Sequence, residues 1–390
     1  MAMQTLVIAH AAFGHNHFFK NNYLFQQWTD PTGILDYLDF AKRYVAACEE
    51  RFGVEAVERT IDAAHALMGQ GVFRYPRAPK LNLAEYERRR RERVAREEQD
   101  YRDLWRTVPG ATQARDDDPA DDDVRERKRQ MRLPEENLLY FLEKNSPKLR
   151  NWQRELLRIV RNVAQYFYPQ RQTKLMNEGC ATFVHYAIVN RLFDKGLISE
   201  GALLEILHSH ANVIAQFDYN DPRFSGFNPY ALGFAMMQDI RRICETPTDE
   251  DREWFPDIAG RKDWPAVLRD IWANYRDESF IRQFLSPRLI RQFRMFALAD
   301  KASDSKVRVE AIHDDEGYRH VRSKLADSYD VGATDPDIQV IEADVLGDRP
   351  LVLRHTMRNG VGLSDVGMEA TLRHLRTLWG YDVRIEEVKG

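Results

Sequence analysis

Two short stretches of this sequence carry side chains that could bind a single metal ion. His10 and His15 lie near the start of the chain, and Glu178 lies far downstream. Two imidazoles on one helix and a carboxylate on another are the usual protein ligands of a zinc site whose fourth position stays open for water. We therefore predict that His10, His15 and Glu178 bind zinc.

The spacing of the two histidines places a condition on the helix that carries them. Residues five apart on a regular α-helix point about 140° away from each other. His10 and His15 can face one ion only if an extra residue is absorbed as a π-bulge, a feature often found at functional sites. Gly14, directly before His15, could ease that adjustment. A π-bulge is therefore expected between residues 10 and 15.

Around Glu178 the sequence has small and polar side chains at useful positions. His185 follows Glu178 by seven residues, so the two share a face of the helix. His185 or Asn177 could orient the carboxylate or a bound water molecule. Gly179 and Ala181 are small enough to let a partner helix approach closely.

Proton transfer at such a site needs a base, and the usual one is missing. Zinc peptidases place a glutamate directly after the first histidine, where this sequence has Ala11. An imidazole titrates near neutrality and can take a proton from water, so three histidines are candidate bases. They are His17, His185 and His210. Tyr186 or Tyr230 could then stabilise an oxyanion.

Two other interpretations of these residues stay open. The metal could be structural, or the fold could be catalytically inactive and retained as a binding module. Alternatively no metal binds, because eleven histidines are an ordinary number for 390 residues and buried imidazoles are often only hydrogen-bonded. The missing glutamate counts against catalysis more than against metal binding, because the Lewis acid and its open position remain without it.

The elements that must position these residues are predicted to be helical up to about residue 300. Apolar residues recur there at helical spacing. Helices are expected over 3–72, from 156 to Pro169, from 173 onward, and over 199–209, 231–244, 264–275 and 286–298. Pro169 is expected to end the second of these helices.

The composition changes twice along the chain. Residues 107–132 have scarcely an apolar side chain and are rich in charge, so they are predicted to be a flexible insertion. Later the pattern changes to that of short strands and helices. Strands are expected over 307–312, 338–343, 351–355 and 383–388, and helices over 314–328 and 365–379. We therefore predict a mainly helical domain over 1–300 that carries the metal site, and a small α+β module over 306–390.

Charge and cysteine content exclude several classes of protein. Lysine and arginine total 57 and aspartate and glutamate total 61, so the net charge of −4 draws the chain neither to nucleic acid nor to anionic lipid. Three widely separated cysteines fit a reducing compartment. No apolar run approaches the roughly 18 residues of a membrane span. Residues 1–8 lack the features of a signal peptide. We expect a cytoplasmic protein with no membrane span and no nucleic-acid partner.

Several long and specific segments are spread over nearly the whole chain. They are residues 9–16, 18–25, 165–174, 176–179, 228–234, 254–258, 277–281, 283–287 and 378–383. In these segments the chain resembles the stage V sporulation protein R family, which is associated with the spore cortex, a peptidoglycan layer, and is widespread in bacteria that form no spores. Members usually carry a sizeable segment before the first histidine motif, so we expect this chain to be truncated and to lack a wall of the site.

A second resemblance concerns mechanism. The pattern from His10 to His15 is similar to the His-Glu-x-x-Gly-His helix of certain zinc dipeptidyl peptidases. Residues 175–181 resemble the helix that supplies the glutamate ligand in zinc aminopeptidases. Carried over by position, this implies that His10, His15 and Glu178 bind the metal and that Ala11 occupies the place of the general base. It also implies a helical zincin-like, metallopeptidase-like domain.

The leading hypothesis is a zinc-dependent hydrolase that cleaves an amide bond in a peptide or in a peptidoglycan-related substrate. The alternative is a non-catalytic regulatory or interaction protein on a peptidase-like scaffold. Such a protein would engage a protein partner through the C-terminal module. A basic and aromatic platform for nucleic acid is missing from the sequence.

Overall fold

The computed structural model describes most of the chain. The described residues are 2–74, 131, 133–219, 221–299, 308–311, 314–344, 347–358 and 361–390. They are mainly helical with a small three-stranded sheet near the C-terminus, as predicted. Of the predicted charged insertion over 107–132, all but Met131 lies outside the described residues. No helix in the described part of the chain combines the length and the apolar character that crossing a lipid bilayer requires.

Contacts within the chain divide it into two compact units, each made from two separate stretches. The first comprises residues 1–42 and 165–335, and the second comprises residues 43–164 and 336–390. The domains predicted from the sequence, 1–300 and 306–390, are each one continuous stretch with a single boundary between them. That division stays a prediction.

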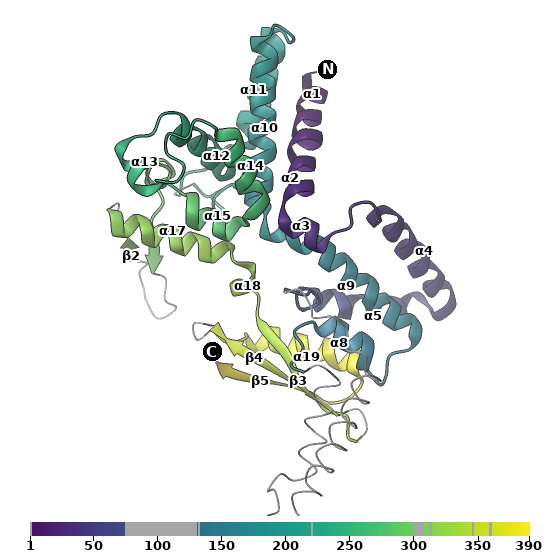
Figure 1. Cartoon of the computed structure of the whole chain (residues 1–390). Coiled ribbons are helices and arrows are strands. Elements are labelled where there is room, and N and C mark those ends of the chain that lie inside the picture. Colours follow the sequence, from purple (N-terminus) through teal and green to yellow (C-terminus); the bar gives the residue numbers. More distant parts are fainter. Residues whose placement is uncertain are drawn as a thin grey trace, which may run out of the picture. The chain divides into compact units, whose positions relative to one another are not determined.

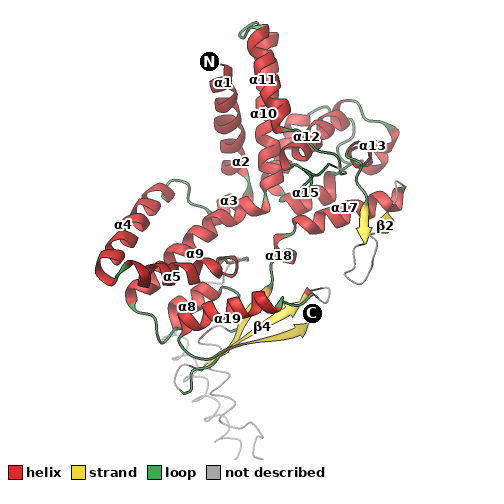
Figure 2. Ribbon diagram, turned by 180° about the vertical axis from the view of Figure 1, so that it is seen from behind, coloured by secondary structure: helices red, strands yellow, loops and turns green. Residues whose placement is uncertain are grey.

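The first unit begins with an N-terminal arm of short helices that follow one another. They are α1 (Ala2–Ile8), a π-helix (Ala9–His15), α2 (Asn16–Asn21) and α3 (Tyr23–Trp28). Asn22 separates the last two helices, and its buried amide donates to the carbonyls of Trp272 and Tyr275. The arm runs alongside α10 (Lys174–Asp194) and α11 (Glu200–Val213), as Figure 1 and Figure 2 show.

The rest of the first unit adds further helices and a short pair of strands. They are α12 (Pro229–Glu245), α13 (Asp249–Trp254), α14 (Trp264–Asn274), α15 (Asp277–Phe284), α16 (Pro287–Gln292), β1 (Ala297–Ala299), β2 (Arg308–Ala311), α17 (Asp315–Tyr329) and α18 (Val331–Thr334). Asn228 and Ser286 cap α12 and α16, and a proline follows each cap, where its fixed φ favours the first helical turn. Met176, Leu232 and Phe280 belong to one buried core that joins α10, α12 and α15.

Two helix ends differ from the sequence prediction. The prediction that Pro169 ends a helix is wrong, because α9 (Asn151–Gln172) continues past it. Because Pro169 has no backbone N–H, the helix loses only one hydrogen bond at this position. The carbonyl of Pro169 accepts a hydrogen bond from the hydroxyl of Thr173. The helix predicted over 286–298 ends at Gln292, because Arg294 adopts a φ of 50° that no helix allows.

The second unit combines helices with the C-terminal sheet. Its elements are the last part of α4 (Ile34–Phe52), α5 (Val54–Ala66), η2 (Met68–Gln70), α8 (Leu138–Asn145), α9 as far as residue 164, β3 (Asp337–Ala343), β4 (Leu351–Met357), α19 (Asp365–Trp379) and β5 (Val383–Lys389). Strand β4 is central, antiparallel to β3 and parallel to β5. Helix α19 connects the parallel pair and lies against the sheet (Figure 2), where Trp379 is buried in the same core as Leu353.

Candidate metal centre

The π-helix brings the two N-terminal histidines to one face. Residues Ala9–His15 form this helix, in which hydrogen bonds join residues five apart rather than four. Side chains five apart therefore lie over one another. The rings of His10 and His15 meet edge to face, with their centroids 4.6 Å apart. The predicted π-bulge is confirmed at the predicted position.

Small residues let the π-helix, α10 and α12 pack closely. A Cβ atom on Gly14 would collide with the backbone of Ala181 on α10. A Cβ atom on Gly179 would lie 2.6 Å from the carbonyl carbon of Gly233 on α12. Because glycine has no side chain, these helices approach to backbone contact. The close approach of the π-helix places Glu178 beside the histidines.

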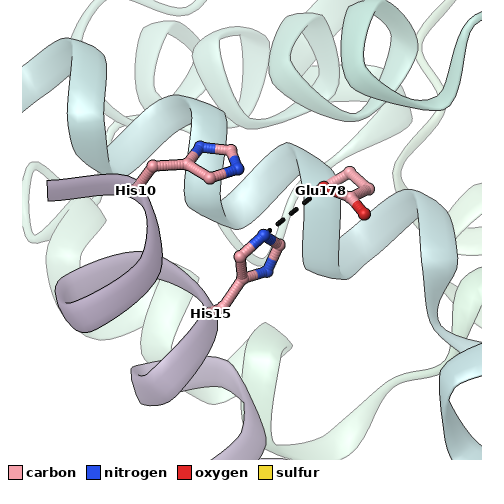
Figure 3. Close-up of side chains that lie close together, drawn as sticks. All are labelled: His10, His15 and Glu178. Carbon is pink, nitrogen blue, oxygen red and sulfur yellow. Dashed lines mark ion pairs between the residues drawn. The ribbon is translucent and has the colours of Figure 1, made fainter. Parts of the chain in front are cut away.

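Glu178 and the two histidines form a compact cluster. Each offers one ligand atom, and these atoms lie within 4.8 Å of one another. Nε2 of His15 is 3.5 Å from Oε2 of Glu178, and Figure 3 shows the three side chains pointing toward one another. Ligand atoms around one tetrahedral zinc ion lie roughly 3.4 Å apart. Small side-chain rotations would therefore close the set around an ion.

Each histidine of the cluster is held through its Nδ1 atom. Nδ1 of His15 lies 2.8 Å from Oδ1 of Asn177 and donates to it, since an amide oxygen only accepts. Nδ1 of His10 lies 3.0 Å from Nδ1 of His185. The backbone carbonyl of Ala181 lies close to both of these rings and opposes the lowering of their pKa. The contacts leave the Nε2 atoms of His10 and His15 to face an ion.

The hydrogen bonds continue from His185 into α11. Nε2 of His185 lies 2.9 Å from Nδ1 of His210, and both side chains are buried. Three imidazoles, from His10 through His185 to His210, therefore form one chain. His208 is exposed and lies near Asn212 instead. Of the two histidines on α11, His210 lies in the histidine chain and His208 does not, because residues two apart on a helix point to different faces.

Burial keeps these imidazoles neutral. It lowers the pKa of His10 to about 4, and the neighbouring His15 adds to the effect. It lowers the pKa of His185 to about 3, with contributions from His210 and His10. Burial also lowers the pKa of His210. Metal binding requires an unprotonated imidazole, so the surroundings hold His10 in its binding form at neutral pH.

One oxygen of Glu178 has no hydrogen-bond partner. Its Oε2 is buried, and no donor among the described residues reaches it. Tyr230 hydrogen-bonds to the same carboxylate; burial, the charge of Glu178 and this bond raise the pKa of Tyr230 to about 12. A buried oxygen without a partner is unfavourable. A cation would supply the missing partner, so these residues fit a zinc ion.

Three further residues were predicted from the sequence to act at this site: Tyr230, Tyr186 and His17. Tyr230 contacts the cluster through its hydroxyl, whereas the ring of Tyr186 packs against His210. His17 lies outside the cluster, and its ring meets Trp272 edge to face. Because it lies two residues beyond His15, its side chain leaves the helix on another face.

A buried aspartate that sequence reasoning missed holds the start of α10. Asp277 accepts hydrogen bonds from the backbone N–H groups of Leu175 and Met176, each at 2.8 Å. Burial raises the pKa of Asp277 to about 7, although these two hydrogen bonds oppose the rise. Glu178 follows in the next turn of the helix. No spacing signal could connect Asp277 with residues about one hundred positions earlier.

Comparison with known proteins assigns the chain to a family. The model of the family described as SpoVR like protein matches residues 1–334, and that of the SpoVR-like C-terminal domain matches residues 336–390. The chain belongs to the SpoVR-like family. "Uncharacterized protein YcgB" of Escherichia coli (strain K12) is 51% identical over 387 residues, which cover 99% of this chain and 74% of that protein. No solved structure matches the chain.

The two SpoVR-like matches meet close to residue 335. The longer match includes every residue of the cluster, and the shorter match includes the three strands β3, β4 and β5. The family predicted from the sequence motifs is therefore confirmed.

Proposed function

We propose that His10, His15 and Glu178 bind one zinc ion and that the site hydrolyses an amide bond in a peptide. The observation that carries the proposal is the buried Oε2 of Glu178, which faces Nε2 of His15 and has no donor among the described residues. Two neutral imidazoles and a carboxylate form the ligand set of open zinc sites. On this proposal the helical first unit is a zincin-like, metallopeptidase-like domain.

Residues beside the ligands would orient them, and the proton of the attacking water would pass to solvent, because Ala11 has no group that could take it. When bound, zinc polarises a carbonyl group and lowers the pKa of water. The hydroxyl of Tyr230, with its pKa raised to about 12, keeps its proton at neutral pH and donates it to Glu178, which would orient this carboxylate toward the ion. Asn177 and His185 hold the rings of the two ligand histidines in one orientation.

If His10 binds the ion, all hydrogen bonds of the histidine chain are donated in one direction, from His10 toward His210. A ring that binds through Nε2 carries its proton on Nδ1, so His10 donates to Nδ1 of His185. His185 then carries its proton on Nε2 and donates to His210. His210 in turn carries its proton on Nε2, where it can donate to a substrate carbonyl. His210 thus serves as a hydrogen-bond donor rather than as the base expected from the sequence.

A second candidate function is metal-dependent peptide binding without catalysis. Ala11 stands where a general base is expected and has no group that could take a proton. Both ring nitrogens of His185 are occupied by other histidines. A protein of this kind would keep the zinc site, hold a peptide or a protein partner, and leave the amide bond intact. The two functions differ in turnover and not in metal content.

Elemental analysis of the purified full chain tests the metal site. One zinc ion per chain is expected in the wild type and in the control His208→Ala, because this exposed histidine lies outside the histidine chain. His15→Ala and Glu178→Gln are expected to lose the metal while they keep the helical circular dichroism spectrum. Wild-type protein that stays free of zinc after incubation with excess zinc would overturn the proposal.

Turnover by the zinc-loaded chain separates the two functions. We expect cleavage within a panel of quenched fluorescent peptides and muropeptides, with activity lost on chelation and restored by zinc. Glu178→Gln serves as the inactive control. Zinc-loaded protein that binds peptides but cleaves none of them would replace the hydrolase with the binding function.

A further inference from the structure

A cavity of about 560 Å³ adjoins the metal cluster. Its walls come from the N-terminal arm, from α10, from α11 and from the start of α12. The apolar part of the lining consists of Leu6, Val7, Ala11 and Val213. The polar end contains His10, a proposed ligand, and Tyr230, which contacts Glu178. The cavity therefore opens directly onto the position of the proposed ion.

The lining offers no partner for a charged ligand. Among the described residues it contains no aspartate, glutamate, lysine or arginine. The side chain of Asn228 also lines it, but its amide donates to the carbonyls of Val213 and Ala215 and its oxygen accepts from the N–H of Tyr230. An ionised group placed there would lose its hydration without gaining a counter-charge, which is unfavourable.

Apolar surface in the cavity is still exposed to water. Val7 is 58% exposed and Val213 is 38% exposed, although both side chains line the cavity. A ligand that covers them would release water from apolar surface, which favours binding. The volume lies within the range of small-ligand pockets and exceeds a single aliphatic side chain.

We infer that this cavity binds the apolar side chain of a peptide whose adjacent amide group lies at the metal cluster. The inference rests on the proposed function and names its substrate class. The substrate is an apolar peptide rather than a muropeptide, because the carboxylates of a muropeptide meet no charged side chain in the lining of this cavity. His210 provides a donor for the peptide carbonyl at the cavity's polar end.

Hydroxamates test the inference, because they bind zinc directly and can carry one side chain at a time. The zinc-loaded full chain is titrated calorimetrically with acetohydroxamate, N-acetyl-leucine hydroxamate and N-acetyl-glutamate α-hydroxamate. We expect the leucine compound to bind roughly 10-fold or more tightly than acetohydroxamate, as burial of one aliphatic side chain predicts. The glutamate compound should gain nothing over acetohydroxamate.

Two cavity-filling variants test whether the leucine side chain binds in this cavity. Val213→Trp and Val7→Trp place a large ring at exposed positions of the lining, so either should remove the preference for leucine and leave acetohydroxamate binding unchanged. Leu204→Trp, at a 61% exposed position of α11 outside the lining, is the matched control and should keep the preference. Zinc content is measured for each variant as the check on the metal site.

The possible outcomes separate this inference from the proposed function. Protein without zinc, or zinc-loaded protein that binds no hydroxamate, overturns the open metal site and the inference with it. Zinc-loaded protein that binds all three hydroxamates equally, or prefers the glutamate compound, overturns the inference alone. A leucine preference that survives both tryptophan substitutions would show that another surface binds the side chain, and it also overturns the inference.

Discussion

The two ring nitrogens of His15 have different neighbours. Nδ1 donates to Asn177, and Nε2 faces Glu178. An amide acceptor at one nitrogen fixes both the tautomer and the orientation of the ring, so little freedom is lost when the other nitrogen binds an ion. Metal affinity at this site should therefore depend on side chains that never touch the ion.

The first prediction concerns Asn177. Asn177→Leu removes the acceptor for His15 at similar side-chain size, and we expect zinc affinity to fall by roughly 10- to 100-fold. Competition with a chromophoric chelator measures the affinity. Asn190→Leu is the control on the same helix, because its amide donates to the carbonyl of Tyr186 and, among the described residues, contacts no histidine of the cluster. Equal affinities in the two variants would contradict the orienting role of Asn177.

Asp277 gives a prediction about pH. Burial raises the pKa of its carboxyl from 3.8 to about 7. The folded state thus binds this proton more tightly than the unfolded chain does. The corresponding contribution to the free energy of unfolding is present in full below pH 3.8 and is lost as the pH rises to about 7.

Asp277→Asn removes the titration and keeps one acceptor for the N–H groups at the start of α10. The free energy of unfolding of the wild type, relative to this variant, should therefore decrease between about pH 4 and pH 7. Urea denaturation at a series of pH values measures the difference. Asp270→Asn, at an exposed position, is the control. Parallel pH profiles for wild type and Asp277→Asn would contradict the buried titration.

At the scale of single residues, the sequence could predict what depends on local spacing. His10 and His15 are close along the chain, and Asn177 is adjacent to Glu178, so their types and order were sufficient to propose them together. Asp277 reaches α10 only through the tertiary fold, and no local pattern could reveal it. Distance along the chain explains the difference.

At the scale of secondary-structure elements, backbone contacts between helices fix the geometry of the candidate site. Gly179 meets Gly233, and Gly14 meets Ala181, so both faces of α10 have neighbours without room for another carbon atom. Interiors packed to this density respond to a single added methyl group. Helix α10 therefore has little freedom to move Glu178 toward or away from the histidines.

A methyl group at the α10–α12 contact should destabilise the protein. Gly179→Ala places a carbon atom 2.6 Å from the carbonyl carbon of Gly233, and we expect a loss of about 1–3 kcal/mol in the free energy of unfolding. Gly201→Ala on α11 is the control, because nothing lies within 4 Å of its Cβ position and alanine favours helix. Denaturant titration measures both. A neutral Gly179→Ala would mean that the helices can separate freely.

The π-helix gives a prediction about spacing. Deletion of Ala12 reduces the separation of His10 and His15, the proposed ligands, from five residues to four, which a regular α-helix accommodates on one face, so zinc binding should persist. Insertion of one alanine after Ala12 increases the separation to six and should abolish binding. Zinc content of the two proteins tests this. Loss of zinc in both would show that the π-helix does more than correct the spacing.

Among the elements, those with strong periodicity were predictable and those set by short turns were not. The strands near 338–343, 351–355 and 383–388 and the helices near 314–328 and 365–379 are confirmed. The short helices α13 and α15 span too few residues for a periodic signal, although α13 has a capping box at Thr248. The helix expected up to residue 298 was mistaken because a positive φ at Arg294 interrupts it, and no residue type requires that conformation.

For the molecule as a whole, zinc should stabilise one unit. All three proposed ligands belong to the first unit. Zinc at about 100 times its dissociation constant would add about 2.7 kcal/mol to the stability of the unit that binds it. Hydrogen exchange should slow in residues 2–28 and 174–213 and stay unchanged in residues 336–390. Equal protection of all three ranges would contradict this, and Glu178→Gln controls for unspecific effects of zinc.

The division into units could not be read from the sequence. Each unit joins two distant stretches of chain, and the boundaries at residues 42 and 164 fall within α4 and α9. A change of composition marks a linker, but a boundary inside a continuous helix leaves no such mark. Packing between distant residues, and not local pattern, decides which stretch belongs to which unit.

This arrangement has a consequence for biosynthesis. The ribosome completes the N-terminal arm long before α10 exists, and Phe18 and Phe25 of the arm reach their buried places only against later residues. The whole of the second unit's first stretch is translated in between. The nascent arm therefore keeps these apolar side chains uncovered until α10 has been made, and an ion at the proposed site could bind only after that point.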